Sequence, residues 1–71
     1  MGQKIATPGD YIHVRRRTLA ITKAEAARLA GLSDTQWRDI ERSHRLPTDQ
    51  ELAAVARVLQ IDAGVLKRRY G

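Results

Sequence analysis

The chain is predicted to be an all-α protein that forms one small domain of five short helices. Ser, Thr or Asp residues suited to helix N-caps recur along the sequence, and each precedes a segment of helical length. Apolar residues within these segments are spaced three or four positions apart, as in helices that bury one face. The length of 71 residues is near the lower limit for a self-sufficient core and fits one domain.

The first helix is expected to begin after a short N-terminal arm. Residues 1–6 are expected to form this flexible arm, and residues 7–71 the folded domain. Thr7 is suited to the N-cap position and Pro8 to the first helical position, while Asp10 lies near the positive end of the helix. We therefore expect the helix to begin at Pro8.

The centre of the chain, about residues 22–42, has the spacing of two short helices joined by a tight turn. Thr22-Lys23-Ala24-Glu25 and Ser33-Asp34-Thr35-Gln36 both match the capping box that opens a helix. Gly31 lies between them, where a left-handed residue commonly ends a helix. This arrangement is typical of a DNA-binding helix-turn-helix. The two helices are expected over about Lys23–Ala30 and Asp34–Arg42.

Two further helices are expected after a loop over residues 43–47. Thr48-Asp49-Gln50-Glu51 is a third capping box and opens the fourth helix. Asp62 can cap the fifth helix, which is expected over about Ala63–Arg69. The apolar residues expected to face the core from these two helices are Leu52, Val55, Ala56, Leu59, Val65 and Leu66.

The charge of the chain favours a polyanionic partner. Thirteen Lys and Arg residues against eight Asp and Glu residues give a net charge of +5. Of these, six basic and two acidic residues fall in the first thirty positions, including the run Arg15, Arg16 and Arg17. Many small domains are basic, so the charge gains weight because it coincides with the helix-turn-helix pattern.

The composition argues against several classes of protein. The chain has no Cys, which removes disulfides and thiolate metal sites. His13 and His44 lie far apart without a ligand cluster, so neither a metal site nor a cofactor is expected. No Ser/His/acid set, phosphate loop or pair of catalytic carboxylates is visible, so an enzyme is not expected. The apolar runs are too short for a membrane span or signal peptide, and a cytoplasmic location is expected.

The third predicted helix has one continuous polar face. At about 100° per residue, this face contains Asp34, Thr35, Arg38, Asp39 and Arg42. All five side chains can form hydrogen bonds with the edges of bases. An ordinary solvated helix face is the alternative interpretation. The preceding capped helix and glycine turn favour the DNA-reading interpretation.

The other side of this helix carries Gln36, Trp37, Ile40 and Glu41. Trp37 is expected to anchor the core of a chain that lacks Phe, although an aromatic side chain can also stack on unpaired bases. Glu41 is a carboxylate on this inner side, and Arg16 is the charged member of an apolar stripe on the first helix. Because either charge alone would be costly to bury, the two are expected to form a structural ion pair.

Residues 15–47 resemble the lambda-repressor and Cro-like helix-turn-helix family, often called the XRE family. The two closing helices also resemble those of the family, so the resemblance covers about 60 of the 71 residues. The matching positions are Arg16, Ile21-Thr22-Lys23-Ala24-Glu25, Ala27, Leu29, Gly31-Leu32-Ser33, Ile40-Glu41-Arg42 and Pro47, followed by Leu52, Val55, Ala56, Leu59 and Leu66.

The resemblance implies a compact five-helix lambda-repressor-like fold and a sequence-specific transcriptional regulator of bacterial or phage origin. Such proteins bind double-stranded DNA as homodimers, with the third helix in the major groove. The implied base-facing residues are Asp34, Thr35, Arg38 and Asp39. The implied phosphate-contacting residues are Arg17, Lys23, Arg28, Ser33, Arg42 and Arg45. The inner Arg–Glu pair of the family falls on Arg16 and Glu41.

This sequence departs from the family pattern at several positions. Lys23 replaces the usual Gln, Trp37 replaces a smaller aliphatic residue, and Asp34 and Asp39 place two carboxylates on the reading face. Carboxylates can accept a hydrogen bond from cytosine N4 but repel phosphate. The alternative function is therefore a protein-interaction module, antitoxin-like or a phage accessory protein, whose acidic third helix binds a protein partner.

Self-association is expected to involve the last helix. A single module reads one half-site, and two-fold symmetry places two reading helices about 34 Å apart on DNA. The residues expected to make the contact are Val65, Leu66 and Tyr70, together with the loop before Thr48. The alternative is that these residues close the core of the monomer.

Overall fold

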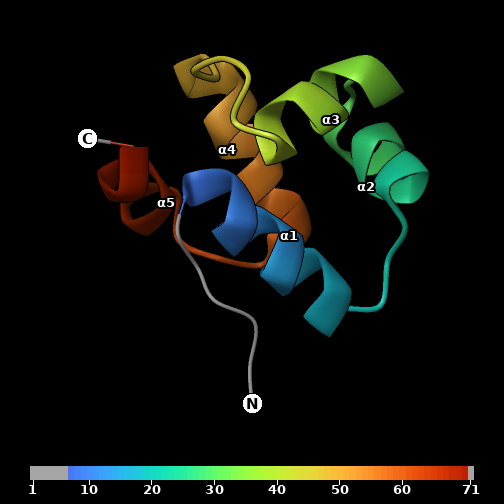
Figure 1. Cartoon of the computed structure of the whole chain (residues 1–71). Helices are drawn as coiled ribbons and strands as arrows, with labels where there is room; N and C mark the ends of the chain where they lie inside the picture. Colours follow the sequence, from blue (N-terminus) through green and yellow to red (C-terminus); the bar gives the residue numbers. More distant parts are fainter. Residues whose placement is uncertain (1–6, 71) are drawn as a thin grey trace.

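A computed structural model describes residues 7–70 of the chain, and this part consists of five helices joined by short turns (Figure 1). The arm expected over residues 1–6 lies outside the described residues. None of the helices in residues 7–70 is long and apolar enough to cross a membrane. The helices are α1 (Pro8–Thr18), α2 (Lys23–Ala30), α3 (Asp34–Glu41), α4 (Asp49–Leu59) and α5 (Ala63–Tyr70).

The five helices pack around one apolar core. Helix α2 contacts both α3 and α4, α4 contacts α5, and α1 contacts α3, α4 and α5. In Figure 1, α2 and α3 lie on one side of the molecule and α5 on the other, with α1 between them. The buried apolar residues are Ile12, Ala26, Ala27, Ala30, Trp37, Ile40, Leu52, Val55, Ala56, Leu59 and Leu66. The predicted all-α, five-helix fold is confirmed.

Most of the predicted helix caps form as expected. Ser33 and Thr48 both form reciprocal capping boxes, and so does Thr7, whose backbone N–H donates to the Asp10 carboxylate. Asp62 accepts hydrogen bonds from the backbone at the start of α5. Gly31 ends α2 with φ 72°, in the left-handed conformation that glycine adopts at little cost.

The capping box predicted at Thr22 forms only in part. The Thr22 hydroxyl accepts from the backbone N–H of Glu25, but the Glu25 carboxylate does not return the bond. It lies instead 4.0 Å from the guanidinium of Arg28, one turn further along the helix. The local pattern therefore predicted the helix start correctly. The second bond of the capping box is absent because the Glu25 carboxylate lies toward Arg28 and not toward the backbone N–H of Thr22.

Helix α3 is one residue shorter than predicted, and α5 is one residue longer. Arg42 is the C-cap of α3, and its N–H donates to the carbonyl of Arg38 over 2.9 Å. The next residue, Ser43, has φ 60°, which cannot continue a right-handed helix. Arg42 therefore lies just beyond the last helical residue, where it is exposed.

The first turn of α1 packs closely against the end of α3. Gly9 is buried, and a Cβ atom placed on it would lie 2.1 Å from the backbone carbonyl oxygen of Glu41. Because that oxygen belongs to the backbone, it cannot move aside as a side chain could. Gly9 thus allows α1 and α3 to approach each other at the site described next.

Candidate nucleic-acid interface

The outer face of α3 is open to solvent. Asp34, Thr35 and Arg38 are exposed, and the helix presents them side by side over its first two turns. Asp39 is half-buried, with 33% of its side chain exposed, and its carboxylate lies 3.6 Å from the imidazole of His44. Three of the four predicted base-facing residues are therefore exposed, and the fourth lies beside a histidine that the sequence analysis did not link to it.

The inner face of α3 is buried, as predicted for three of its four residues. Trp37 is 0% exposed, Ile40 1% and Glu41 7%. Trp37 is therefore a core residue and is not available for stacking on bases. Gln36 was assigned to the same side but is exposed, because its amide oxygen turns back to accept from the N–H of Ser33 over 2.8 Å.

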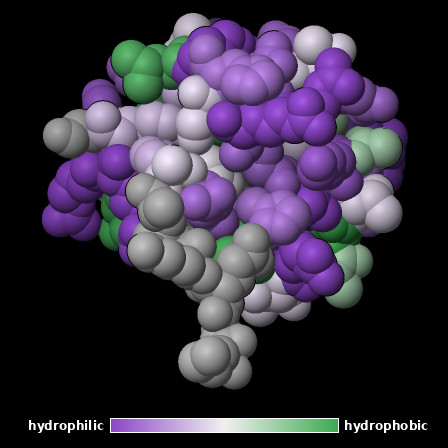
Figure 2. Space-filling model, viewed as in Figure 1, coloured by the Kyte–Doolittle hydropathy of each residue, from purple (hydrophilic) through white to green (hydrophobic). Residues whose placement is uncertain are grey.

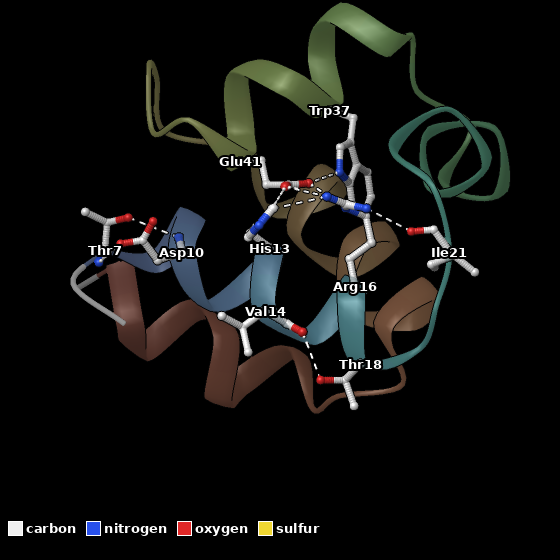
Figure 3. A network of polar contacts seen from close by, with 9 residues as sticks. All are labelled: Thr7, Asp10, His13, Val14, Arg16, Thr18, Ile21, Trp37 and Glu41. Atoms are coloured by element: carbon white, nitrogen blue, oxygen red, sulfur yellow. Dashed lines mark hydrogen bonds and ion pairs between the residues drawn. The ribbon is translucent and has the colours of Figure 1, made fainter. Parts of the chain in front are cut away.

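The ion pair predicted between Arg16 and Glu41 is present and buried. Nε of Arg16 donates to Glu41 Oε2 over 3.0 Å, and a terminal nitrogen donates to Oε1 over 3.1 Å. The other terminal nitrogen of Arg16 donates to the backbone carbonyl of Ile21 over 2.8 Å. Figure 3 shows these groups converging between α1, α3 and the segment that leads into α2. The pair therefore fixes both helices of the helix-turn-helix against α1.

Two further side chains, which the sequence analysis did not predict, donate to the same carboxylate. Nδ1 of His13 lies 2.6 Å from Glu41 Oε1, and the indole N–H of Trp37 donates to Oε2 (Figure 3). His13 precedes Arg16 by three residues, and Trp37 precedes Glu41 by four, so both share a helix face with the pair. That spacing is the signal that could have identified them.

This convergence keeps Glu41 ionised. Burial alone would raise the pKa of Glu41, but hydrogen bonds from Arg16, His13 and Trp37 outweigh it and lower the pKa below its ordinary value. The carboxylate is an anion with donors on both oxygens. It serves as the attachment point of α3.

Most predicted phosphate-contacting residues are accessible. Lys23 is the first residue of α2, Ser33 caps α3, and Arg42 follows the last turn of α3. Ser33, whose hydroxyl accepts from the N–H of Gln36, can still donate its own proton. Arg17 on α1 and Arg28 on α2 are also exposed. Figure 2 shows that the face viewed in Figure 1 is largely hydrophilic.

Arg45 has a different environment from the one predicted. Its two terminal nitrogens donate to the two carboxylate oxygens of Glu51 over 2.8 and 2.7 Å. This hydrogen bonding from Arg45 lowers the pKa of Glu51 from 4.5 to about 2, and a hydrogen bond from the backbone N–H of Thr48 adds to the effect. Arg45 thus ties the loop to the first turn of α4, which does not support its assignment as a phosphate contact.

The predicted self-contact is also revised. Leu66 is 0% exposed and closes the core of the monomer, so it is not available for a second copy. Val65 and Tyr70 are half-buried. The loop before Thr48 carries Leu46, which is 76% exposed and is the most accessible large apolar side chain in residues 7–70.

Comparison with known proteins places this geometry in a family. A helix-turn-helix domain family matches residues 9–69. The chain belongs to the helix-turn-helix domain family. Two solved structures share its fold, and both are of the P22 c2 repressor. A comparison with curated protein sequences gave no match.

The first of these structures is a crystal structure of the P22 c2 repressor in complex with a synthetic operator. It is 29% identical to the chain, covers 87% of the chain and 94% of the repressor chain, and has a TM-score of 0.80. The second is a solution structure of the DNA-binding domain of the same repressor. It is 28% identical, covers 92% of the chain and 86% of that domain, and has a TM-score of 0.81. The predicted resemblance to lambda-repressor-like domains is confirmed.

Proposed function

We propose that this chain is a transcriptional regulator that binds double-stranded DNA sequence-specifically, with α3 in the major groove. The observation that carries the proposal is the contrast between the two faces of α3. Its outer face presents Asp34, Thr35 and Arg38 to solvent, while its inner face is fixed to α1 through Glu41. A rigidly held helix with free polar groups suits base reading. The similarity to a repressor solved in complex with an operator supports it.

The outer face suggests which bases are read. Arg38 can donate two hydrogen bonds to O6 and N7 of guanine, the commonest specific contact in the major groove. Asp34 and Asp39 can accept from N4 of a nearby cytosine. Thr35 can bind either a base edge or the methyl group of thymine. We expect a half-site that contains G·C pairs opposite the first two turns of α3.

The phosphate contacts are proposed to surround this helix. Lys23, Arg28 and Ser33 come from α2 and the turn, Arg42 from the end of α3, and Arg17 from α1. Because Asp34 and Asp39 cancel the charge of Arg38 and Arg42, most of the electrostatic affinity comes from residues outside α3.

We propose that two copies bind a two-fold symmetric site. The exposed Leu46 and the half-buried Tyr70 line one depression and are the main candidates for this contact, and the half-buried Val65 is a further candidate on α5. Two-fold pairing would place two α3 helices about one turn of DNA apart. The proposed location is the cytoplasm of a bacterial cell, with the chain of phage or bacterial origin, in keeping with its similarity to a P22 repressor.

The proposal is tested by selecting binding sites from a random oligonucleotide pool with wild-type protein and with Arg38→Ala. We expect wild type to enrich one half-site and Arg38→Ala to lose its preference for one guanine, by about 1–3 kcal/mol. Arg57→Ala is the matched control, because Arg57 is exposed on α4 and donates to the carbonyl of Leu29. An unchanged base profile in Arg38→Ala would remove Arg38 from the reading face.

The same selection distinguishes the protein-interaction alternative. If the acidic face of α3 binds a protein, Asp34→Ala and Asp39→Ala would bind every DNA sequence equally well or more tightly than wild type. If Asp39 reads cytosine, Asp39→Ala would relax the preference at one position only.

A further inference from the structure

The two histidines of the chain lie on one hollow beside the proposed DNA contacts. The hollow has a volume of about 560 Å³ and lies between the start of α1, the start of α2 and the end of α3. Six of the seven residues that line it are charged or titratable, and the seventh is a threonine. The residues are Thr7, Asp10, His13, Lys23, Glu41, Arg42 and His44.

We propose that this hollow binds a backbone phosphate of DNA and that His13 is a donor to it only when protonated. This inference rests on the proposed function and extends it, because it makes DNA affinity depend on pH. Lys23 and Arg42 supply permanent positive charge to the hollow. His13 supplies a positive charge that a proton adds or removes.

The orientation of the His13 ring is the main argument. Its Nδ1 lies 2.6 Å from the ionised Glu41 and therefore carries a proton that it donates to the carboxylate. A neutral ring then has a lone pair on Nε2, which would repel a phosphate oxygen. Adding a proton to Nε2 turns this atom into a donor while the bond to Glu41 is kept. In residues 7–70, Nε2 has no hydrogen-bond partner, and 27% of the side chain is exposed.

The other charges around His13 are compatible with this role. On α1, a terminal nitrogen of Arg16 lies 3.1 Å from the same Nδ1 of His13, and this nitrogen donates to Glu41 of α3, which is the shared acceptor of both groups. The Asp10 carboxylate accepts from the N–H of Thr7. Lys23 faces the hollow from α2, and Arg42 from the end of α3. His44 lies at the rim with 60% of its side chain exposed, and it faces Asp39. Because Arg16 offsets Glu41 and the Asp10 carboxylate offsets one of the two remaining cations, Lys23 and Arg42 leave a small excess of positive charge in the hollow.

Binding measurements at about pH 6 and pH 8 test the proposal. Wild-type protein is expected to bind a fixed duplex roughly 5- to 10-fold more tightly at the lower pH, with a salt slope steeper by about one unit. His13→Asn keeps a donor at the position of Nδ1 but has no atom in place of Nε2. Its affinity is expected to differ little between the two pH values, so that most of the pH dependence is lost. His44→Asn is the matched control and is expected to keep the dependence.

A second measurement uses the wild-type protein alone, so that it does not depend on the folding of a variant. Coupling between two binding events is reciprocal, so duplex DNA must increase the protonated fraction of His13 at neutral pH. NMR of the two imidazoles with added duplex would measure this. Inorganic phosphate at the same phosphate concentration is expected to have no such effect, which separates a DNA contact from a site for the free anion.

The possible results separate the inference from the proposed function. DNA binding with no pH dependence would overturn the inference and leave the function intact, as would a dependence that His44→Asn removes and His13→Asn keeps. A response of His13 to inorganic phosphate but not to duplex would also overturn it. Absence of binding to any duplex at either pH would overturn the proposed function, and the inference with it.

Discussion

Two carboxylates hold neighbouring parts of the molecule in place through different kinds of contact. Glu41 holds α3 against α1, and Glu51 holds the loop after α3 against the start of α4. Glu41 is buried, and three side chains from α1 and α3 donate to it. Glu51 is also buried, in the first turn of α4, where Arg45 and the backbone of Thr48 donate to it. The first joins elements far apart in the sequence, and the second joins residues six positions apart. The contrast indicates that the orientation of α3 depends on long-range contacts, and the path of the following loop on local ones.

The largest expected effect comes from removing the first carboxylate. Glu41→Ala should lower the free energy of unfolding by about 3–5 kcal/mol, because it leaves the buried guanidinium of Arg16 without its partner. Chemical denaturation would measure the loss. Glu25→Ala is the control, since Glu25 is exposed and 4.0 Å from Arg28, and it should change stability by less than about 0.5 kcal/mol. Equal stability of both variants would contradict the structural role of Glu41.

A somewhat smaller effect is expected from crowding the same junction. Gly9→Ala should destabilise the protein by about 2–3 kcal/mol, because the new Cβ would overlap the backbone carbonyl of Glu41 and push α1 away from α3. Gly64→Ala is the matched control in a first helical turn, where the nearest atom is a side-chain oxygen of Asp62 at 3.0 Å. Thermal unfolding of both variants would test this. A wild-type melting temperature for Gly9→Ala would show that the two helices can separate freely.

The smallest effect concerns Glu51, and its signature is a change in how the free energy of unfolding depends on pH. Because folding lowers the pKa of Glu51 from 4.5 to about 2, its contribution is fully present above pH 4.5 and is lost as the pH falls toward 2. Glu51→Gln should therefore flatten the decline in stability over this range and leave the contribution of Glu41 unaltered. Urea unfolding at about pH 6 and pH 3 would show the difference. An unchanged slope would mean that the pair with Arg45 does not form in solution.

Local patterns in the sequence were sufficient to predict the five helices. Caps, apolar spacing and Gly31 act within a few residues, so their effects can be read without knowing the rest of the fold. The wheel of α3 also predicted that Trp37 and Ile40 are buried and that Glu41 pairs with Arg16. Both conclusions depend only on which side of a helix a residue occupies.

The remaining features depend on how distant segments meet. The sequence places Gly9 in the first turn of a helix but carries no sign that this turn packs against the backbone of α3. His13 and Arg45 carry groups suited to several partners, and only the packed structure selects Glu41 for one and Glu51 for the other. For Glu25, in contrast, the error is local. Its carboxylate was predicted to accept from the backbone N–H of Thr22, and within the same helix it lies beside Arg28 instead.

Two helix ends offer positions where a substitution to glycine is expected to stabilise this domain without changing its side-chain polar contacts. Ala20 after α1 and Gln60 after α4 both have φ 58°, a conformation that costs an ordinary residue on the order of 1 kcal/mol and glycine almost nothing. Both lie outside α3 and the hollow. A chain with glycine at these two positions therefore offers a background in which damaging substitutions at the α1–α3 junction can be studied while the protein is still folded.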